Sequence, residues 1–498
     1  MRNVISPQMQ FGQIDIPNID IDVTSRDDIP VILLGLQHIY INEPLRKAVF
    51  KILEEVIPFK MKDKATSATS VALDKGRPGM EQWNILVLGC LRLGLNTDYD
   101  RIQELANQHR TLRMMLGHGF LDTEKDYRLQ TLKDNLKLFT PDIMDRINRE
   151  VIRAGYELLD LDIDAMIRGR CDSFVLKTDV HFPTDINLLY DAIRVLIRDC
   201  AHWSKDYLLP GWRQNQYNLR QFKKLYRKIQ KLRHSSSKDE TKKQAQAEKI
   251  RDAHHDYIKL AHTYLARVTE SYALLKNTHK IPETLLLELK VFSQHADRQI
   301  DQIKRRVIEG EKIPHNEKVF SLFQPHTEWI SKGKAGVPVE LGLRVCIMED
   351  THGFLLHHRV MQNETDDKIA IAMVKATQEK FPSFNGCSFD KGFHSPENQR
   401  ELKVLLDQTV LPKKGRLNSK EKEHEYADEF VQAKKKHSAV ESAINALEIH
   451  GLDKCPDHGI EGFERYTAMA VLSRNIQILG SIVRKQEREK LDPQKLAA

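Results

Sequence analysis

The sequence predicts an α/β core that is interrupted by a long helical insertion and preceded by an all-α N-terminal domain. Apolar residues recur at helical spacing through residues 31–165 and again through 187–307, and a β-prone apolar run at 174–180 separates these blocks. Further strand-like runs then alternate with helical segments, at 337–347, 354–361, 387–390 and 410–411. Strands that alternate with helices indicate a sheet covered by helices.

The chain begins with an arm and a helical domain. Residues 1–30 are expected to form an extended arm, because Pro17 and Pro30 interrupt a short alternating pattern. Residues 31–165 follow as the helical N-terminal domain. Its expected helices span 44–57, 82–93, 98–108, 125–138 and 141–159.

One helix pair in this domain is compatible with DNA recognition. The helix at 98–108, a turn at His109-Arg110 and a second helix at 111–116 follow the order of a helix-turn-helix. Arg110 and Arg113 would then point outward as candidate DNA contacts. Helix pairs of this kind are also common packing units, so both interpretations remain open.

The insertion, at about 200–320, contains the excess of positive over negative charge in the chain. Residues 212–251 contain 13 Lys and Arg against 3 Asp and Glu, whereas the whole chain has a net charge of only +7. Aromatic residues lie among these cations, which is typical of nucleic-acid binding. A solvated helical hairpin whose aromatics pack along its seam is the alternative. The candidate DNA contacts here are Trp212, Arg220, Lys223, Lys224, Arg227 and Lys228.

Residues 166–480 form the predicted catalytic domain around this insertion, and residues 481–498 form a polar tail. Three carboxylates in the domain suit metal chemistry: Asp172 at the head of the first strand, Asp390 at the end of a later strand, and Glu441 on a helix. A two-metal site that cleaves phosphodiesters requires such groups, because hard oxygen ligands hold Mg²⁺ while leaving room for water and phosphate.

The first of these carboxylates has an alternative. Asp179 is also flanked by apolar residues, and it follows Asp172 by seven positions. In one straight strand an odd separation directs the two side chains to opposite faces, so both cannot serve the same site.

The expected helix around Glu441 has one polar face. His437, Glu441 and Asn445 follow one another at four-residue intervals and therefore share this face. An ordinary solvated helix face is the alternative. The candidate DNA contacts of the catalytic domain are Lys413, Lys414, Lys435, Lys436, His437 and Asn445.

Composition bears on where the protein resides. No apolar run approaches the length of a membrane span, and the N-terminus lacks the basic-then-apolar pattern of a secretion signal. The six cysteines form no C-x-x-C pair, which favours reduced thiols over disulfides or a zinc site. We therefore expect a cytoplasmic protein.

Four sequence blocks resemble, in the same order, those of bacterial insertion-sequence transposases of the ISNCY type. The first begins with Asp172-Ser173 and continues with Val-His-Phe-Pro-Thr-Asp at 180–185. The second block comprises 337–343 and 353–360, the third is Asp390-Lys391-Gly392-Phe393, and the fourth comprises 437–447, 450–455 and 462–466. The match covers roughly residues 165–480, whereas the N-terminal region resembles the helical DNA-binding domains of such transposases only loosely.

The resemblance implies a DDE transposase with an RNase H-like catalytic core. Asp172, Asp390 and Glu441 would be its catalytic and metal-binding residues, with two Mg²⁺ ions as cofactors and Mn²⁺ as a substitute. The implied partners are double-stranded DNA, both the terminal inverted repeats of the transposon and target DNA, and further copies of the chain in a homodimer or larger oligomer. The implied location is the bacterial cytoplasm, at the nucleoid when DNA is bound.

The chain departs from the wider pattern at two positions. Related transposases often place Arg four residues before the catalytic Glu and Lys seven residues after it, where they contact phosphate. This chain has His437 and Glu448 there. Two other functions remain open: a catalytically silent DNA-binding protein of the same origin, and a nuclease that cuts DNA without joining it. The presence of all three carboxylates favours an active transposase.

Overall fold

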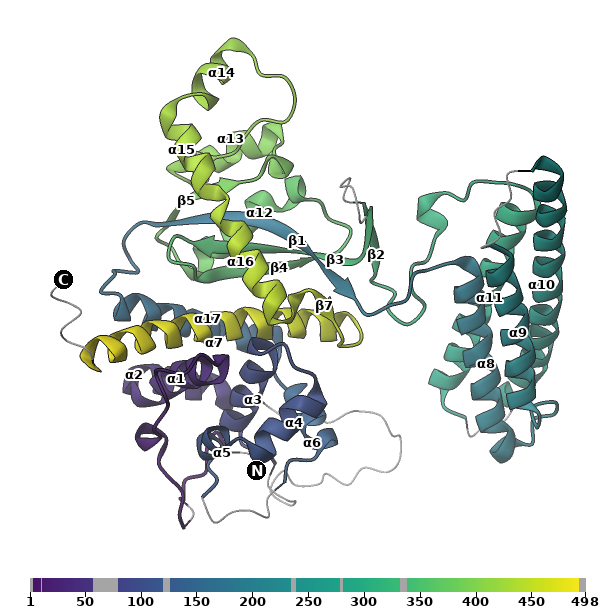
Figure 1. Ribbon diagram of the computed structural model, residues 1–498, viewed down its shortest axis with the longest axis horizontal. Coiled ribbons are helices and arrows are strands. Elements are labelled where there is room, and N and C mark those ends of the chain that lie inside the picture. The colour runs from purple at the N-terminus through teal and green to yellow at the C-terminus, as the bar shows by residue number, and fades with distance from the viewer. Residues whose placement is uncertain are drawn as a thin grey trace. The chain divides into compact units, whose positions relative to one another are not determined.

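The computed structural model describes residues 3–9, 11–56, 79–119, 126–233, 239–277, 281–331 and 338–491. The chain is a mixed α/β protein that is mostly helical, and it forms two compact units (Figure 1). Unit 1 comprises residues 1–179 and 330–498, and unit 2 comprises residues 180–329. Within the described ranges, no helix is both long and apolar enough to cross a membrane.

The sheet is mixed, with the order β2-β3-β1-β5-β6, and in addition β4 pairs with β3 and β7 with β1. β1, β3 and β4 are joined antiparallel, whereas β5 and β6 extend the sheet parallel to β1. The strands are β1 Ile167–Thr178, β2 Glu328–Ser331, β3 Val339–Asp350, β4 Leu355–Met361, β5 Phe384–Phe389, β6 Gln408–Val410 and β7 Lys454–Cys455.

The first strand is longer than the sequence predicts. It begins at Ile167 instead of residue 174, so Asp172 lies inside the strand and not at its head. The charged side chains of Arg168 and Arg170 flank Gly169, and this polar stretch conceals the strand from a search for apolar runs.

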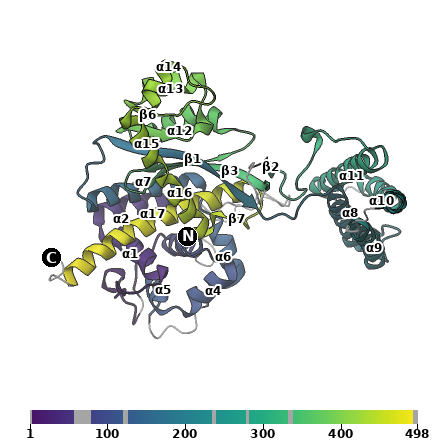
Figure 2. The ribbon, with the colours of Figure 1, turned by 45° about the horizontal axis from the view of Figure 1, so that its top comes forward.

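One face of the sheet is covered by α12 (Asp366–Lys380) and α13 (Pro396–Leu405), as Figures 1 and 2 show. α12 connects β4 to β5, and α13 connects the parallel strands β5 and β6. On this face Cys171 of β1 and Met348 of β3 are buried in one apolar cluster with Met373 of α12.

The opposite face packs against the N-terminal helices and the C-terminal helix α17 (Ile460–Leu491). Phe174 and Leu176 of β1 share one apolar core with residues of α1, α3, α7 and α17. The boundary predicted at residue 165 therefore does not separate two cores. The N-terminal helices are α1 Asp28–Ile41, α2 Glu43–Glu54, α3 Gln82–Gly94, α4 Tyr99–Gln108, α5 Arg110–Met115, α6 Leu129–Leu136 and α7 Pro141–Leu158; residues 57–78 and 120–125 of this region lie outside the described residues.

Two glycines allow α1 and α17 to cross closely. A Cβ atom on Gly480 would lie 1.9 Å from the carbonyl oxygen of Val31, and one on Gly35 would lie 2.3 Å from the carbonyl oxygen of Ile476. Any larger residue at either position would force the helices apart, because the interior is closely packed. The C-terminal helix is thus fixed against the first helix of the chain.

Both predicted terminal segments are partly integrated into unit 1. The arm is mostly irregular, but the amide of Gln37 in α1 donates hydrogen bonds to the carbonyl oxygens of Ile16 at 2.9 Å and Ile19 at 2.8 Å. The polar tail predicted at 481–498 is helical as far as Leu491, because its polar residues are good helix formers that continue α17. Residues 492–498 lie outside the described residues.

Unit 2 contains a bundle of four helices (Figure 1). They are α8 Asp185–Tyr207, α9 Asn215–Arg233, α10 Glu240–Lys276 and α11 Glu283–Ile303. Aromatic side chains dominate the core of the bundle: Phe222 of α9 stacks on Tyr257 of α10, with ring centroids 4.4 Å apart. The insertion predicted at about 200–320 lies within this unit, and α8 belongs to it as well.

Candidate functional site

Asp172 lies near the middle of β1 and faces the α17 side of the sheet. Side chains alternate along a strand, so Asp172 shares its face with Phe174, whereas Cys171 faces α12. One carboxylate oxygen of Asp172 accepts a hydrogen bond from the backbone N–H of Ser173 at 2.8 Å. The side chain is partly buried.

Asp390 follows β5 directly and lies beside Asp172 by register. β1 and β5 are parallel, and Cys171 pairs with Phe389. Continued by one position past the end of β5, this register aligns residue 172 with residue 390, and neighbouring strands lie about 4.8 Å apart. Asp390 is exposed, and its Oδ2 accepts the N–H of Gly392 at 3.2 Å, which caps the short helical turn Lys391–Phe393.

Glu441 reaches the same face of the sheet from a helix. α15 (Asp428–His437) packs against β5 and β6, and α16 (Ala439–Leu447) packs against β1. The helix predicted at 427–447 is thus divided at Ser438, which ends α15 and precedes α16. Figure 1 shows the two helices crossing the sheet one after the other. Glu441 lies in the first turn of α16 and is exposed.

A fourth carboxylate, Asp366, was not predicted. It opens α12, and its Oδ1 accepts a hydrogen bond from Ser173 Oγ at 2.6 Å. A Cβ atom on Gly392 would lie 3.2 Å from Asp366 Oδ2 and 3.6 Å from Asp390 Oδ2, so these two oxygens flank the same point. An acidic residue in a first helical turn is common for dipole reasons, and the sequence alone therefore did not single out Asp366.

Asp172 lies within electrostatic reach of the other three carboxylates. The pKa of the Asp172 carboxyl is raised to about 6, chiefly by burial and further by the negative charges of Asp390, Asp366 and Glu441. Like charges that raise a pKa in this way favour uptake of either a proton or a metal cation. The structure therefore brings together the three predicted acidic residues and adds one.

The oxygen donors of this site fit Mg²⁺ by their chemistry. In the part of the chain that the structure describes, no three His, Cys, Asp or Glu side chains are arranged to hold a metal ion by themselves. Mg²⁺ in nucleotide-processing sites is commonly bound by one or two carboxylates, with water and substrate phosphate as the other ligands. The four carboxylates match that partial donor set and do not form a closed cage.

His437 lies beside the carboxylates. Its Nδ1 is 3.0 Å from Ser388 Oγ on β5. Burial, and to a smaller extent the positive charge of Arg170, lower the pKa of His437, against the opposing effects of Asp390 and Glu441. The Nε2 atom of His437 is buried and has no hydrogen-bond partner among the described residues, so this ring offers no exposed donor to a DNA phosphate.

Two cations near the site are candidates for the role of the missing Arg and Lys. Lys414 Nζ lies 3.5 Å from the carbonyl oxygen of Gly392, next to Asp390. Arg170, which was not predicted, lies two residues before Asp172 on the same face of β1 and forms an ion pair with Glu349 at 3.2 Å. Lys414 is exposed, whereas Arg170 is half-buried.

Asp179, the alternative first carboxylate, lies away from this group. β1 ends at Thr178, and the exposed Asp179 forms an ion pair with Lys454 at 2.5 Å. Its charge is not among the influences on the pKa of Asp172. The placement of the carboxylates therefore favours Asp172.

The other predicted DNA contacts of unit 1 are dispersed. Lys435, Lys436 and Asn445 are exposed on α15 and α16. Lys413 forms an ion pair with Glu421 of α14 (Ser419–Glu425) at 2.6 Å, so its charge is already balanced.

The predicted helix-turn-helix has an unusual geometry. Only His109 separates α4 from α5, and α5 has six residues, Arg110–Met115. A helix-turn-helix usually has a turn of three or four residues and a longer second helix. Arg110 is exposed, whereas Arg113 is half-buried and donates to the carbonyl oxygen of Asn107 at 3.2 Å. This geometry favours a packing role for the pair.

The prediction for Trp212 in unit 2 is wrong. The side chain has no exposed surface, and its indole N–H donates to Ser271 Oγ at 2.8 Å. A base cannot stack on a ring that is enclosed in the bundle. The five predicted cations of α9, in contrast, are all exposed: Arg220, Lys223, Lys224, Arg227 and Lys228.

No protein family, curated protein or solved structure was found to match this chain.

Proposed function

We propose that the protein is a DDE-type DNA transposase with an RNase H-like catalytic core. One observation carries the proposal: the negative charges of Asp390 and Glu441, which are far from Asp172 in the chain, both raise the pKa of Asp172. The strand arrangement supports it, because an antiparallel β1-β3-β4 group extended by the parallel strands β5 and β6 is the arrangement expected of an RNase H-like sheet.

Asp172, Asp390 and Glu441 would hold two Mg²⁺ ions, with Mn²⁺ as a substitute. Bound there, the ions would stabilise the attacking and leaving oxygens of a phosphodiester and lower the pKa of a water molecule. Asp366, through its hydrogen bond with Ser173, would fix the backbone beside Asp172. His437, with Nδ1 at Ser388 of β5, would help hold α15 against the sheet.

The reaction is a two-step transfer of a phosphodiester. Water cuts one strand at the transposon end and leaves a 3′-hydroxyl group, which then attacks a phosphate of target DNA and displaces its 3′-oxygen. The partners are double-stranded DNA with terminal inverted repeats, target DNA and further copies of this chain, in a homodimer or larger oligomer. The proposed location is the bacterial cytoplasm.

The test is a strand-transfer assay with DNA that ends in the inverted repeats flanking the coding sequence. The wild-type chain is expected to cut and join these ends in Mg²⁺ or Mn²⁺, but not in EDTA. Asp390→Asn should lose both steps while Asp179→Asn keeps them, because only Asp390 belongs to the carboxylate group.

Three other results would each contradict the proposal. Normal cleavage by a folded Asp390→Asn variant would show that the carboxylate group is not the catalytic site. Cutting without joining would indicate a nuclease. Binding of DNA without any cleavage by the wild type would indicate a silent descendant of a transposase.

A further inference from the structure

The outward face of α9 is strongly basic. Its cations recur at intervals of three and four residues, which places them on one side of the helix. They line a surface groove of about 1060 Å³, to which Gln246 of α10 contributes. The residues are Arg220, Lys223, Lys224, Arg227, Lys228 and Lys231, here called the α9 basic face, and all six side chains are exposed.

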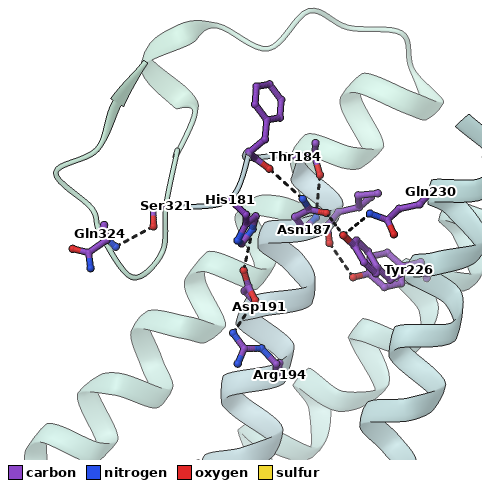
Figure 3. Close-up of polar contacts among 12 residues, drawn as sticks. His181, Thr184, Asn187, Asp191, Arg194, Tyr226, Gln230, Ser321 and Gln324 are labelled. Atoms are coloured by element: carbon purple, nitrogen blue, oxygen red, sulfur yellow. Dashed lines mark hydrogen bonds and ion pairs between the residues drawn. The ribbon is translucent and has the colours of Figure 1, made fainter. Parts of the chain in front are cut away.

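The inward side of α9 determines which way this face points. The hydroxyl group of Tyr226 donates a hydrogen bond to the side-chain oxygen of Asn187 in α8, and the amide of Gln230 donates a hydrogen bond to Tyr226 Oη at 2.6 Å (Figure 3). Phe222 is fully buried and stacks on Tyr257. Both polar and aromatic contacts therefore fix the rotation of α9, and the cations are held on the solvent side.

The charge of the α9 basic face is almost unbalanced. Among the residues that the structure describes, only Lys228 of the six has a carboxylate partner, Asp256 at 3.3 Å. Residues 220 to 231 span about 16 Å of helix, over which duplex DNA presents about ten phosphates. A row of like charges with so few counter-charges repels itself, and a polyanion of matching charge density would relieve that repulsion.

We propose that the α9 basic face binds the phosphate backbone of duplex DNA without reading its bases. Trp212 and Phe222, which could otherwise stack on unpaired bases, are fully buried in the bundle, and Tyr217 in the first turn of α9 is an exposed aromatic beside the face. Binding of single strands combines a charged groove with stacking of successive bases, so a row of six cations beside one exposed ring suits the backbone of a duplex better. The choice of duplex DNA over duplex RNA rests on the proposed function, whereas the backbone-only mode rests on the helix itself.

The experiment measures binding of the full chain to two unrelated 30-base-pair DNA duplexes by fluorescence anisotropy, at several KCl concentrations and in EDTA so that no cleavage occurs. The test variant is Lys223→Gln/Lys224→Gln/Arg227→Gln/Lys231→Gln. The matched control removes the same charge from exposed positions of α10, as Lys242→Gln/Lys249→Gln/Arg251→Gln/Lys259→Gln. Circular dichroism verifies that both variants fold.

Wild-type chain should bind both duplexes equally and more tightly than a single strand. Each lost phosphate contact lowers the slope of log affinity against log salt by about 0.9, so the test variant should lose about 3 to 4 in slope and roughly a hundredfold or more in affinity at 100 mM salt. The control variant should change the slope by less than about 1.

Equal losses in the test and control variants would overturn the proposal, because they would indicate a general charge effect. Preferential binding of a single strand, of duplex RNA or of one duplex sequence would overturn it too. The outcome is independent of the active site, because binding is measured in EDTA: a loss of affinity in the test variant alone supports the proposal even if the wild-type chain proves to cut no DNA.

Discussion

The acidic site of unit 1 and the α9 basic face of unit 2 are both groups of like charges, but they are built differently. The acidic residues come from β1, the start of α12, the end of β5 and α16, and they meet only because the sheet aligns these elements. The basic residues come from successive turns of a single helix. The first group therefore depends on the tertiary fold, and the second depends on little more than helix formation.

The two groups also differ in how strongly their charges disfavour one another. Burial and the neighbouring negative charges raise the pKa of Asp172, so the ionised form of this carboxyl group is disfavoured. The α9 cations are exposed to solvent, which screens their repulsion. A strained group of this kind is typical of a site that binds an ion, whereas a solvated group suits a surface that associates with a polyanion reversibly.

The largest expected effect is a loss of stability in unit 1 that leaves the α9 basic face of unit 2 functional. Gly480→Ala places a methyl group against the carbonyl of Val31, so we expect a loss of about 3 kcal/mol in the free energy of unfolding of unit 1. Ser481→Ala, the neighbouring change on the same helix, should cost less than about 1 kcal/mol. Chemical denaturation gives both values. DNA binding by the α9 basic face should survive in Gly480→Ala; its loss together with unit 1 would show that the two regions are not separate.

A second effect concerns the strain at Asp172. Its pKa is raised from 3.8 to about 6, so the folded state prefers the protonated form, and ionisation costs stability as the pH rises from 4 through 6. Asp172→Asn removes this cost, and we expect it to stabilise the metal-free protein by about 2 kcal/mol at pH 8, allowing for partial solvent exposure, and by less at pH 5.

Thermal and urea unfolding in EDTA measure this difference. Asp179→Asn is the matched control and should change stability by less than about 0.5 kcal/mol, because Asp179 is exposed in a surface ion pair. A destabilised Asp172→Asn variant at pH 8 would mean that burial and the neighbouring charges do not disfavour the ionised form of Asp172 as described.

A smaller effect is expected at Asp366. If this residue fixes the position of Asp172 through Ser173, then Asp366→Asn should lower DNA cleavage about 10- to 100-fold at limiting Mg²⁺ and recover at saturating Mg²⁺. The neighbouring change Asp367→Asn should leave the Mg²⁺ dependence unchanged. Identical behaviour of the two variants would remove Asp366 from the site.

The sequence predicted the mixed α/β fold, the helical N-terminal region and the bounds of α2, α3, α4, α6 and α7 to within about four residues. Helical periodicity sufficed there, because caps such as Thr140 before Pro141 are local signals. It failed for the boundary at residue 165, because nothing local reveals that α17 is inserted among helices more than 300 positions earlier in the chain.

The charged groups show the same difference between features that depend on local sequence and features that depend on contacts between distant segments. The exposure of the α9 cations could be predicted from spacing along one helix, but the burial of Trp212 depends on Ser271 of another helix and could not. Asp172, Asp390 and Glu441 were predicted from motif resemblance. Asp366 was not, because its relation to Ser173 and Gly392 exists only once β1, β5 and α12 are assembled.

The central claim is that Asp172 and its neighbours bind divalent cations, and the most direct measurement is a Mn²⁺ titration followed by electron paramagnetic resonance. Wild-type chain should bind Mn²⁺ in competition with Mg²⁺, Asp172→Asn and Asp390→Asn should lose this binding, and Asp179→Asn should retain it. Wild-type Mn²⁺ binding by the Asp172→Asn variant, or no binding by the wild-type chain with duplex DNA present, would contradict the claim.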